Sequence, residues 1–199
     1  LDVDPSHFYT SSLAPAEFLS NQKPECSAYV IGEPGLIHAL YEKGISMNDV
    51  NPDYVVVGET RNYNYDNIIR AVKLVNNGAK LIGTNPDMTA PSEQGIIPAT
   101  RALVAPIELS TGAYAYYVGK PNPLMMKTGI KLLGVETEEA VIVGDRMDTD
   151  IIAGIESGIE TVLVLSGVTD FEVMPHFPYR PKYIYRNVGD IVKGISAEK

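Results

Sequence analysis

The chain has 199 residues, a formal net charge of −9 and a single cysteine, Cys26. Hydrophobic residues make up 45% and charged residues 21%, as in ordinary globular proteins, and no apolar run approaches the roughly 18 residues of a membrane span. The negative charge opposes binding to nucleic acid, and one cysteine cannot form an internal disulfide. We therefore expect a soluble, cytoplasmic protein that binds neither nucleic acid nor membranes.

Short runs of aliphatic and β-branched residues alternate along the chain with stretches whose apolar residues recur at helical spacing. The strands predicted by this pattern are 27–32, 54–58, 80–84, 114–118, 140–144, 161–165 and 183–185. The helices predicted by it are 34–43, 65–77, 98–109, 123–133 and one that begins near Thr149. Pro98 would start the third helix, and Pro106 would interrupt it. Continuous Val/Ile/Leu strands between helices indicate an α/β fold with a doubly wound, Rossmann-like parallel sheet covered on both faces.

Charged residues directly follow two of these strands. The buried-type strand 140–144 runs into Gly-Asp-Arg-Met-Asp-Thr-Asp, residues 144–150, and the strand 114–118 runs into Gly-Lys-Pro, residues 119–121. Ligands of doubly wound sheets bind at the carboxyl ends of the strands. Asp145 and Asp150 are suited to Mg²⁺, and Lys120 can supply positive charge to a phosphate. We expect both strands in one sheet, so that each signal strengthens the other.

Each of these residues also has a plain structural explanation. The acidic segment is equally compatible with a solvated turn in which Thr149 caps the next helix and Asp150 lies in its first turn. A single lysine after a strand is most often a surface residue. Spacing alone leaves both alternatives open.

Two segments resemble motifs III and IV of the haloacid dehalogenase (HAD) superfamily. They are Gly-Lys-Pro-Asn-Pro at 119–123 and VIVGDRMDTDI at 141–151. The longer segment VGDRMDTDIIAGIESGIETVLVLSGVT resembles the NagD-like branch, which is related to p-nitrophenyl phosphatases. The segments DVDPSHFYTSSLA, NPDYVVVGETRNYNYD and LIGTNPD fit the same branch, so the resemblance covers nearly the whole chain.

This resemblance implies a Mg²⁺-dependent phosphomonoester hydrolase that uses an aspartyl-phosphate intermediate. Its substrates would be small phosphorylated metabolites such as sugar phosphates and nucleoside monophosphates, and also p-nitrophenyl phosphate. Lys120 would orient the nucleophile and the phosphate, Asp145 would bind Mg²⁺ directly, and Asp150 would support the metal shell. Asp148 falls at a variable position of the motif and receives no role.

The resemblance also implies an α/β cap of the C2 type, inserted into the HAD core. Residues 1–16 would end the N-terminal part of the core, 17–112 would form the cap, and 113–199 would form the C-terminal part of the core.

Cap loops choose the substrate in this family, which makes four residues candidates for contacts with the leaving group. They are Glu59, Thr60, Asn85 and Asp87, although Gly-Glu-Thr and Asn-Pro-Asp are also ordinary turn sequences. The sequence selects neither a natural substrate nor an oligomeric state, and a homodimer is compatible with it.

Motif I of the family, an apolar strand followed by Asp-x-Asp-Gly, carries the nucleophile and has no counterpart here. Asp2-Val3-Asp4 has the Asp-x-Asp spacing, but Leu1 alone cannot be the preceding strand, and Pro5-Ser6 stand where Gly-Thr is expected. We therefore expect the attacking carboxylate in a segment of about 50 to 60 residues upstream, given the length that two strands and a crossover need. The HAD core would then be incomplete in these 199 residues, and they would be inactive alone.

Two other classes of protein are alternatives to a HAD phosphatase. A non-catalytic metal- or ligand-binding protein on the same fold is the alternative if the absence of motif I is genuine. A dinucleotide-dependent oxidoreductase is disfavoured, because no Gly-x-Gly-x-x-Gly follows any strand.

Overall fold

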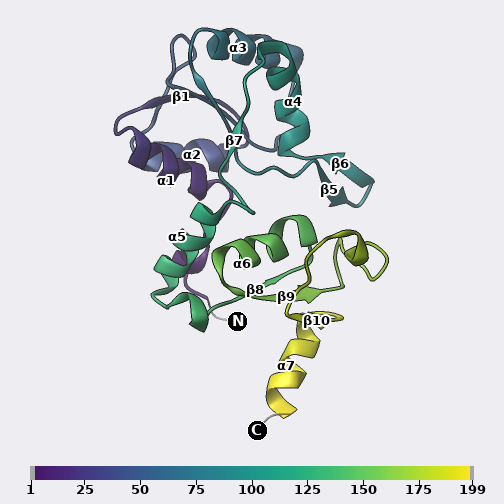
Figure 1. Cartoon of the computed structure of the whole chain (residues 1–199). Coiled ribbons are helices and arrows are strands. Elements are labelled where there is room, and N and C mark those ends of the chain that lie inside the picture. The colour runs from purple at the N-terminus through teal and green to yellow at the C-terminus, as the bar shows by residue number, and fades with distance from the viewer. Residues whose placement is uncertain (1–2, 198–199) are drawn as a thin grey trace. The chain divides into compact units, whose positions relative to one another are not determined.

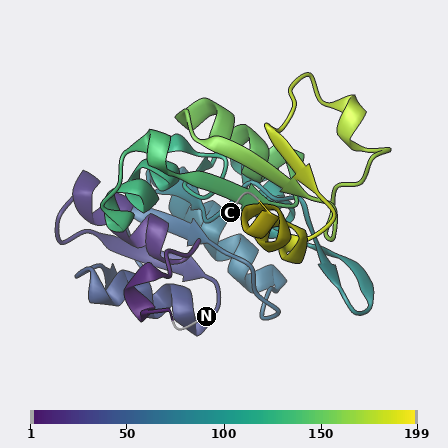
Figure 2. The ribbon, with the colours of Figure 1, turned by 90° about the horizontal axis from the view of Figure 1, so that it is seen from below.

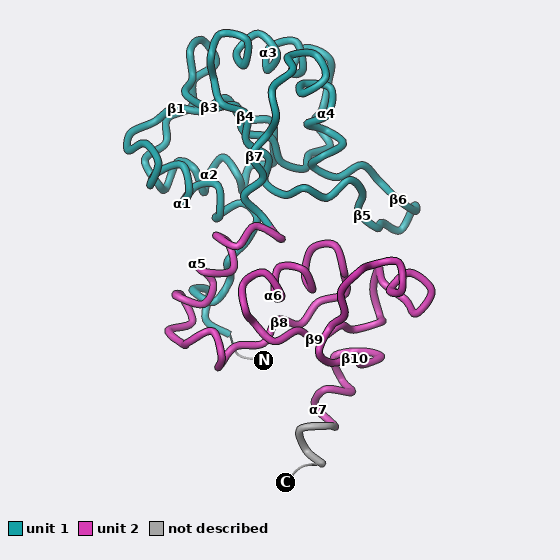
Figure 3. The backbone as a smooth tube through the Cα atoms, viewed as in Figure 1, with its two compact units in different colours: residues 1–119 teal, residues 120–199 magenta. Residues whose placement is uncertain are grey.

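The computed structural model describes residues 3–197, with side chains up to Lys193. The chain forms two compact units, residues 1–119 and 120–199 (Figure 3). No helix among the described residues is long and apolar enough to cross a membrane. Asp2 lies outside the described residues, and Asp4 caps a short 3₁₀ turn, Pro5–His7, by accepting a hydrogen bond from the Ser6 N–H.

The first unit is built on a five-stranded parallel sheet with the order β2-β1-β3-β4-β7. Its strands are β1 (Ser27–Ile31), β2 (Ser46–Met47), β3 (Tyr54–Val57), β4 (Lys80–Gly83) and β7 (Tyr116–Tyr117). Its helices are α1 (Leu13–Gln22), α2 (Pro34–Glu42), α3 (Tyr65–Asn76) and α4 (Thr100–Thr111). A separate antiparallel hairpin consists of β5 (Thr89–Ser92) and β6 (Gly95–Pro98).

Helices cover both faces of this sheet. α1 packs with α2 on one face, and α3 packs with α4 on the other (Figure 1). The aliphatic residues of β3 are accordingly inaccessible to solvent, with Val55, Val56 and Val57 all 0% exposed. The predicted α/β class with a doubly wound parallel sheet is confirmed.

The second unit contains a three-stranded parallel sheet with the order β10-β9-β8. Its strands are β8 (Val141–Gly144), β9 (Glu160–Val164) and β10 (Tyr183–Tyr185), and its α-helices are α5 (Pro123–Leu133), α6 (Ile152–Ser157) and α7 (Val188–Ala197). Single turns lie at Thr137–Glu139, Met147–Ile151 and Met174–His176. Between β9 and β10 the chain makes a long excursion, drawn yellow-green in Figure 2.

Two predictions about the middle of the chain were wrong. The helix expected from Pro98 begins at Thr100, because residues 95–98 pair with residues 89–92 in the hairpin, and Pro106 lies inside the helix without ending it. The strands that precede Lys120 and Asp145 do not share a sheet. β7 pairs with β4 in the first unit, whereas β8 pairs with β9 in the second.

The strand before Asp145 also differs from its prediction as a fully buried strand. Val141 is 51% exposed and Val143 is 44% exposed. Among the described residues β9 is the only strand that pairs with β8, so β8 is an edge strand of the three-stranded sheet.

Candidate active site

The turn after β8 carries both predicted carboxylates. Asp145 is the first residue after the strand, and Asp150 lies in a single π-helical turn, Met147–Ile151. Met147 and Ile151 are both 0% exposed and pack against Leu163 of the neighbouring strand β9. These apolar anchors fix the turn against the sheet.

Thr149 does not cap the following helix, a role that the alternative of a solvated turn required. It is 5% exposed and lies within the π-helical turn, and α6 begins only at Ile152.

Asp150 and Lys120 form an ion pair. The Asp150 Oδ1 accepts a hydrogen bond from the Lys120 Nζ at 2.6 Å, and its Oδ2 accepts one from the Arg146 N–H at 3.1 Å. The Asp150 side chain is 6% exposed, whereas that of Lys120 is 42% exposed. The contact that the structure gives the Lys120 ammonium is thus with Asp150.

The two carboxylates lie at the same end of β8. An ideal Cβ added to Gly144, the last residue of the strand, would stand 2.2 Å from the Asp150 Cγ. Asp150 therefore packs directly against the backbone that precedes Asp145, at the carboxyl end of a parallel strand. Any larger residue at position 144 would occupy the space of the Asp150 carboxyl group.

Asp145 contacts the loop that follows β9. Its Oδ2 accepts a hydrogen bond from the Val168 N–H at 2.8 Å, and its main-chain oxygen accepts one from the Thr169 N–H at 3.0 Å. Sequence reasoning did not single out Gly167, Val168 or Thr169 as site residues. The available signal was topological: β9 follows β8 through one helix, so parallel pairing brings the ends of both strands to one edge.

Arg146 and Asp148 form a two-point ion pair within the same turn. The Nε of Arg146 lies 3.0 Å from the Asp148 Oδ1, and its Nη2 lies 2.7 Å from the Oδ2. Asp148 thus pairs with its neighbour Arg146.

The carboxylates suit an open magnesium site. Among the described residues, no group of three or more His, Cys, Asp and Glu side chains is placed to hold a metal ion. Mg²⁺ nevertheless binds proteins through one or two carboxylates and completes its octahedral shell with water and phosphate oxygens. Asp145 and Asp150 match this requirement in type and number.

The four leaving-group candidates lie at one edge of the first unit's sheet. Glu59 and Thr60 follow β3, and Asn85 and Asp87 follow β4, its parallel neighbour. Glu59 is exposed, and the Thr60 hydroxyl donates a hydrogen bond to the Glu33 carboxylate at 2.7 Å.

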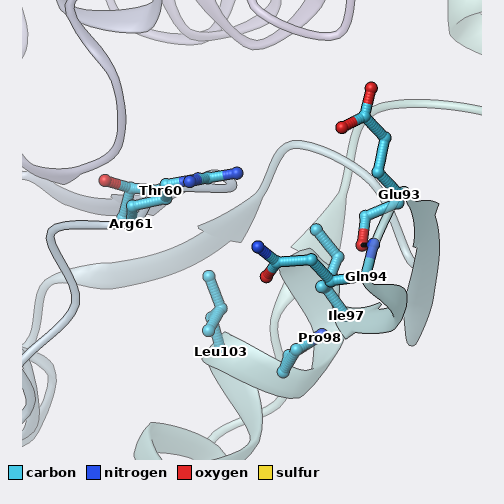
Figure 4. A pocket seen from close by; sticks show the side chains of 8 residues that line it. Thr60, Arg61, Glu93, Gln94, Ile97, Pro98 and Leu103 are labelled. Carbon is cyan, nitrogen blue, oxygen red and sulfur yellow. Dashed lines mark hydrogen bonds between the residues drawn. The ribbon is translucent and has the colours of Figure 1, made fainter.

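A cavity of about 520 Å³ lies in the first unit beside this edge (Figure 4). Its lining residues are Thr60, Arg61, Ser92, Glu93, Gln94, Ile97, Pro98 and Leu103. Of the four candidates, Thr60 belongs to this lining. Gln94 and Leu103 extend into the space in Figure 4, so the hairpin and α4 contribute residues that the sequence did not suggest.

Known proteins match this chain over most of its length. The HAD-hydrolase-like family matches residues 117–191. The dihydroxyacetone phosphatase of Corynebacterium glutamicum (strain R) is 46% identical over 96% of this chain and 70% of its own length. The ribonucleotide monophosphatase NagD of Escherichia coli K12 is 47% identical over 96% of this chain and 75% of its own. A solved structure of the p-nitrophenyl phosphatase from Archaeoglobus fulgidus superposes with a TM-score of 0.90 at 32% identity, over 98% of this chain and 77% of that one.

The parallel α/β units and the charged residues at the ends of their strands thus have the architecture of HAD phosphatases, enzymes that generally use Mg²⁺. The chain belongs to the haloacid dehalogenase superfamily, in its NagD-like branch of phosphatases.

Proposed function

We propose that the protein hydrolyses phosphomonoesters of small metabolites at the site formed by Lys120, Asp145 and Asp150. The observation that carries this proposal is the Lys120–Asp150 ion pair of 2.6 Å, formed in the turn that begins with Asp145 at the carboxyl end of β8. It joins a cation to one of the two carboxylates of the turn after β8, although Lys120 and Asp145 follow strands of different sheets.

Each residue has a distinct task in this proposal. Asp145 would hold Mg²⁺ directly, and Asp150 would support the coordination shell while it fixes the Lys120 ammonium. Bound Mg²⁺ would supply charge neutralisation at the phosphate. The ammonium would lie against phosphate oxygens, where it stabilises the negative charge that develops in the transition state.

The chemistry would follow the two-step route of the family. A carboxylate oxygen of an aspartate forms a bond to phosphorus as the bond to the leaving alcohol breaks, and water then attacks the aspartyl phosphate and releases inorganic phosphate. Asp145 and Asp150 are assigned to the metal, so the attacking aspartate is a different residue.

Sugar phosphates and nucleoside monophosphates are the proposed substrate class. The names of the two relatives, a dihydroxyacetone phosphatase and a ribonucleotide monophosphatase, support it. Glu59, Thr60, Asn85 and Asp87 remain the proposed contacts for the leaving group. The Asn85 Oδ1 supports this role, because it is buried and has no hydrogen-bond partner among the described residues.

The proposed domain division is that of the family, with a cap at 17–112 between core parts at 1–16 and 113–199. We further propose a cytoplasmic location, in line with the single, buried and unpaired Cys26. A homodimer is also compatible with the proposal.

The test is a panel of phosphomonoesters, with p-nitrophenyl phosphate as the reference, assayed on the full-length protein with and without Mg²⁺. We expect Mg²⁺-dependent release of phosphate, and loss of most of it in Asp145→Asn. Glu156→Gln is the control, because Glu156 is an exposed carboxylate on α6 of the same unit. No hydrolysis across the panel would contradict the proposal and favour a non-catalytic binding protein.

A further inference from the structure

The loop of residues 166–169, which follows β9, lies in direct contact with Asp145. An ideal Cβ on Gly167 would stand 2.0 Å from the Asp145 Oδ2, 2.4 Å from its Cγ and 2.5 Å from its Cβ. Such distances are far below van der Waals contact. Rotation of the carboxylate would not relieve them, since the Cβ of Asp145 is itself too close.

The same loop holds Asp145 by its side chain and its main chain. The Val168 N–H donates to the carboxylate and the Thr169 N–H donates to the carbonyl of Asp145. Thr169 is 2% exposed, and its hydroxyl oxygen accepts a hydrogen bond from the Met147 N–H at 3.3 Å. The loop therefore fixes the backbone on both sides of position 146 as well as the rotamer of the aspartate.

These contacts leave most of the carboxylate available. An ionised carboxylate has about four sites for hydrogen bonds or metal ions. Within the described part of the chain, the Val168 N–H is the single hydrogen-bond donor to the Asp145 carboxylate, and it occupies the Oδ2. The arrangement orients the group without saturating it, as expected for a carboxylate that must present an oxygen to a cation.

We infer that Gly167 and Thr169 are positioning residues that hold Asp145 in the orientation required to bind Mg²⁺. The inference rests on the proposed function, in which Asp145 is the direct metal ligand. Glycine is required at position 167 because the carboxylate occupies the volume of a side chain there. Thr169 is required because its buried hydroxyl ties the loop to the turn after β8.

The first experiment compares Gly167→Ala with Gly129→Ala in the full-length protein. Both changes add one methyl group, but an ideal Cβ on Gly129, in α5, meets no atom within 4 Å. The measurements are Mg²⁺ binding by isothermal titration calorimetry without substrate, and the Mg²⁺ concentration for half-maximal hydrolysis of p-nitrophenyl phosphate. We expect Gly167→Ala to weaken Mg²⁺ binding by about 10- to 100-fold, the usual effect of removing a group that orients a metal ligand. Gly129→Ala should bind Mg²⁺ like the wild type.

The second experiment uses Thr169→Val and Thr169→Ser, which keep the side chain small while removing or retaining the hydroxyl. Thr169→Val should weaken Mg²⁺ binding, and Thr169→Ser should restore it. A role in packing alone would give the opposite order, because valine fills the buried site better than serine. If circular dichroism shows that Gly167→Ala is unfolded, the two Thr169 variants test the positioning role without it.

The outcomes separate this inference from the proposed function. Unchanged Mg²⁺ binding in Gly167→Ala and Thr169→Val would overturn the positioning role and leave the hydrolase proposal intact. Weakened binding in both variants of a protein that hydrolyses no phosphomonoester would support the positioning role and contradict the hydrolase. A wild-type protein that binds no Mg²⁺ would overturn both.

Discussion

The ion pair between Lys120 and Asp150 should contribute to folding independently of catalysis. Lys120→Met removes the ammonium and keeps an unbranched chain of similar length. The Asp150 carboxylate, 6% exposed, would then retain the Arg146 N–H at 3.1 Å as its remaining hydrogen-bond donor in the described structure. A buried carboxylate without a countercharge destabilises the folded state.

The size of the effect follows from the exposure of the two partners. Breaking a fully buried ion pair costs about 3–5 kcal/mol, whereas an exposed pair contributes about 0–1 kcal/mol. Lys120 is 42% exposed, so solvent already screens one side of the pair. We therefore expect Lys120→Met to lower the free energy of unfolding by about 2 kcal/mol, between these limits.

A double-mutant cycle isolates the interaction. Urea unfolding followed by circular dichroism is measured for the wild type, Lys120→Met, Asp150→Asn and the double variant. The amide in Asp150→Asn keeps the shape and the acceptor for the Arg146 N–H, so the double variant should recover about 1 kcal/mol relative to Lys120→Met. Additive losses would refute the reasoning, because they would show that the two charges do not interact in the folded protein.

Three further predictions concern Gly144, Cys26 and Asp53. Gly144→Ala places a methyl group 2.2 Å from the Asp150 Cγ, and should lower the free energy of unfolding by about 1–3 kcal/mol in the same urea assay. An unchanged free energy of unfolding would show that the turn after β8 moves to admit the methyl group at no cost. Burial raises the pKa of the Cys26 thiol, so Ellman's reagent should label it only after unfolding, and rapid labelling of the native protein would contradict its placement in the core. Donation from the Lys23 ammonium and the Ser27 N–H lowers the pKa of Asp53 below its ordinary value. The stabilisation from this carboxylate is present above its unfolded pKa of about 4 and is lost as the pH falls through its lower folded pKa. Asp53→Asn should therefore flatten the decline in urea midpoint on acidification below about pH 4, and an unchanged pH profile would contradict the ion pair.

The alternation of strands and helices in the middle of the chain followed directly from the sequence, but α1, β2 and α7 were not predicted. Aliphatic runs such as Tyr-Val-Val-Val at 54–57 form strands because their side chains are buried on both faces of a covered sheet. The hairpin before α4 was missed, because Ile96 and Ile97 are exposed there and pairing across a short turn leaves no buried periodicity. The start of α4 was misplaced for the same reason.

The chemistry of the site was also visible in the sequence, since residue types at strand ends depend on local order alone. The residue types of Lys120, Asp145 and Asp150, and their places after aliphatic strands, were compatible with a phosphate and metal site, and the resemblance to the HAD motifs turned this possibility into a prediction. The partners of these residues were decided by tertiary structure. Lys120 pairs with Asp150 although its strand belongs to another sheet, and the 166–169 loop reaches Asp145 because β9 runs parallel to β8. Such contacts join residues separated by 20 or more positions. Local periodicity carries no information on these distances, because the packing of whole elements sets them.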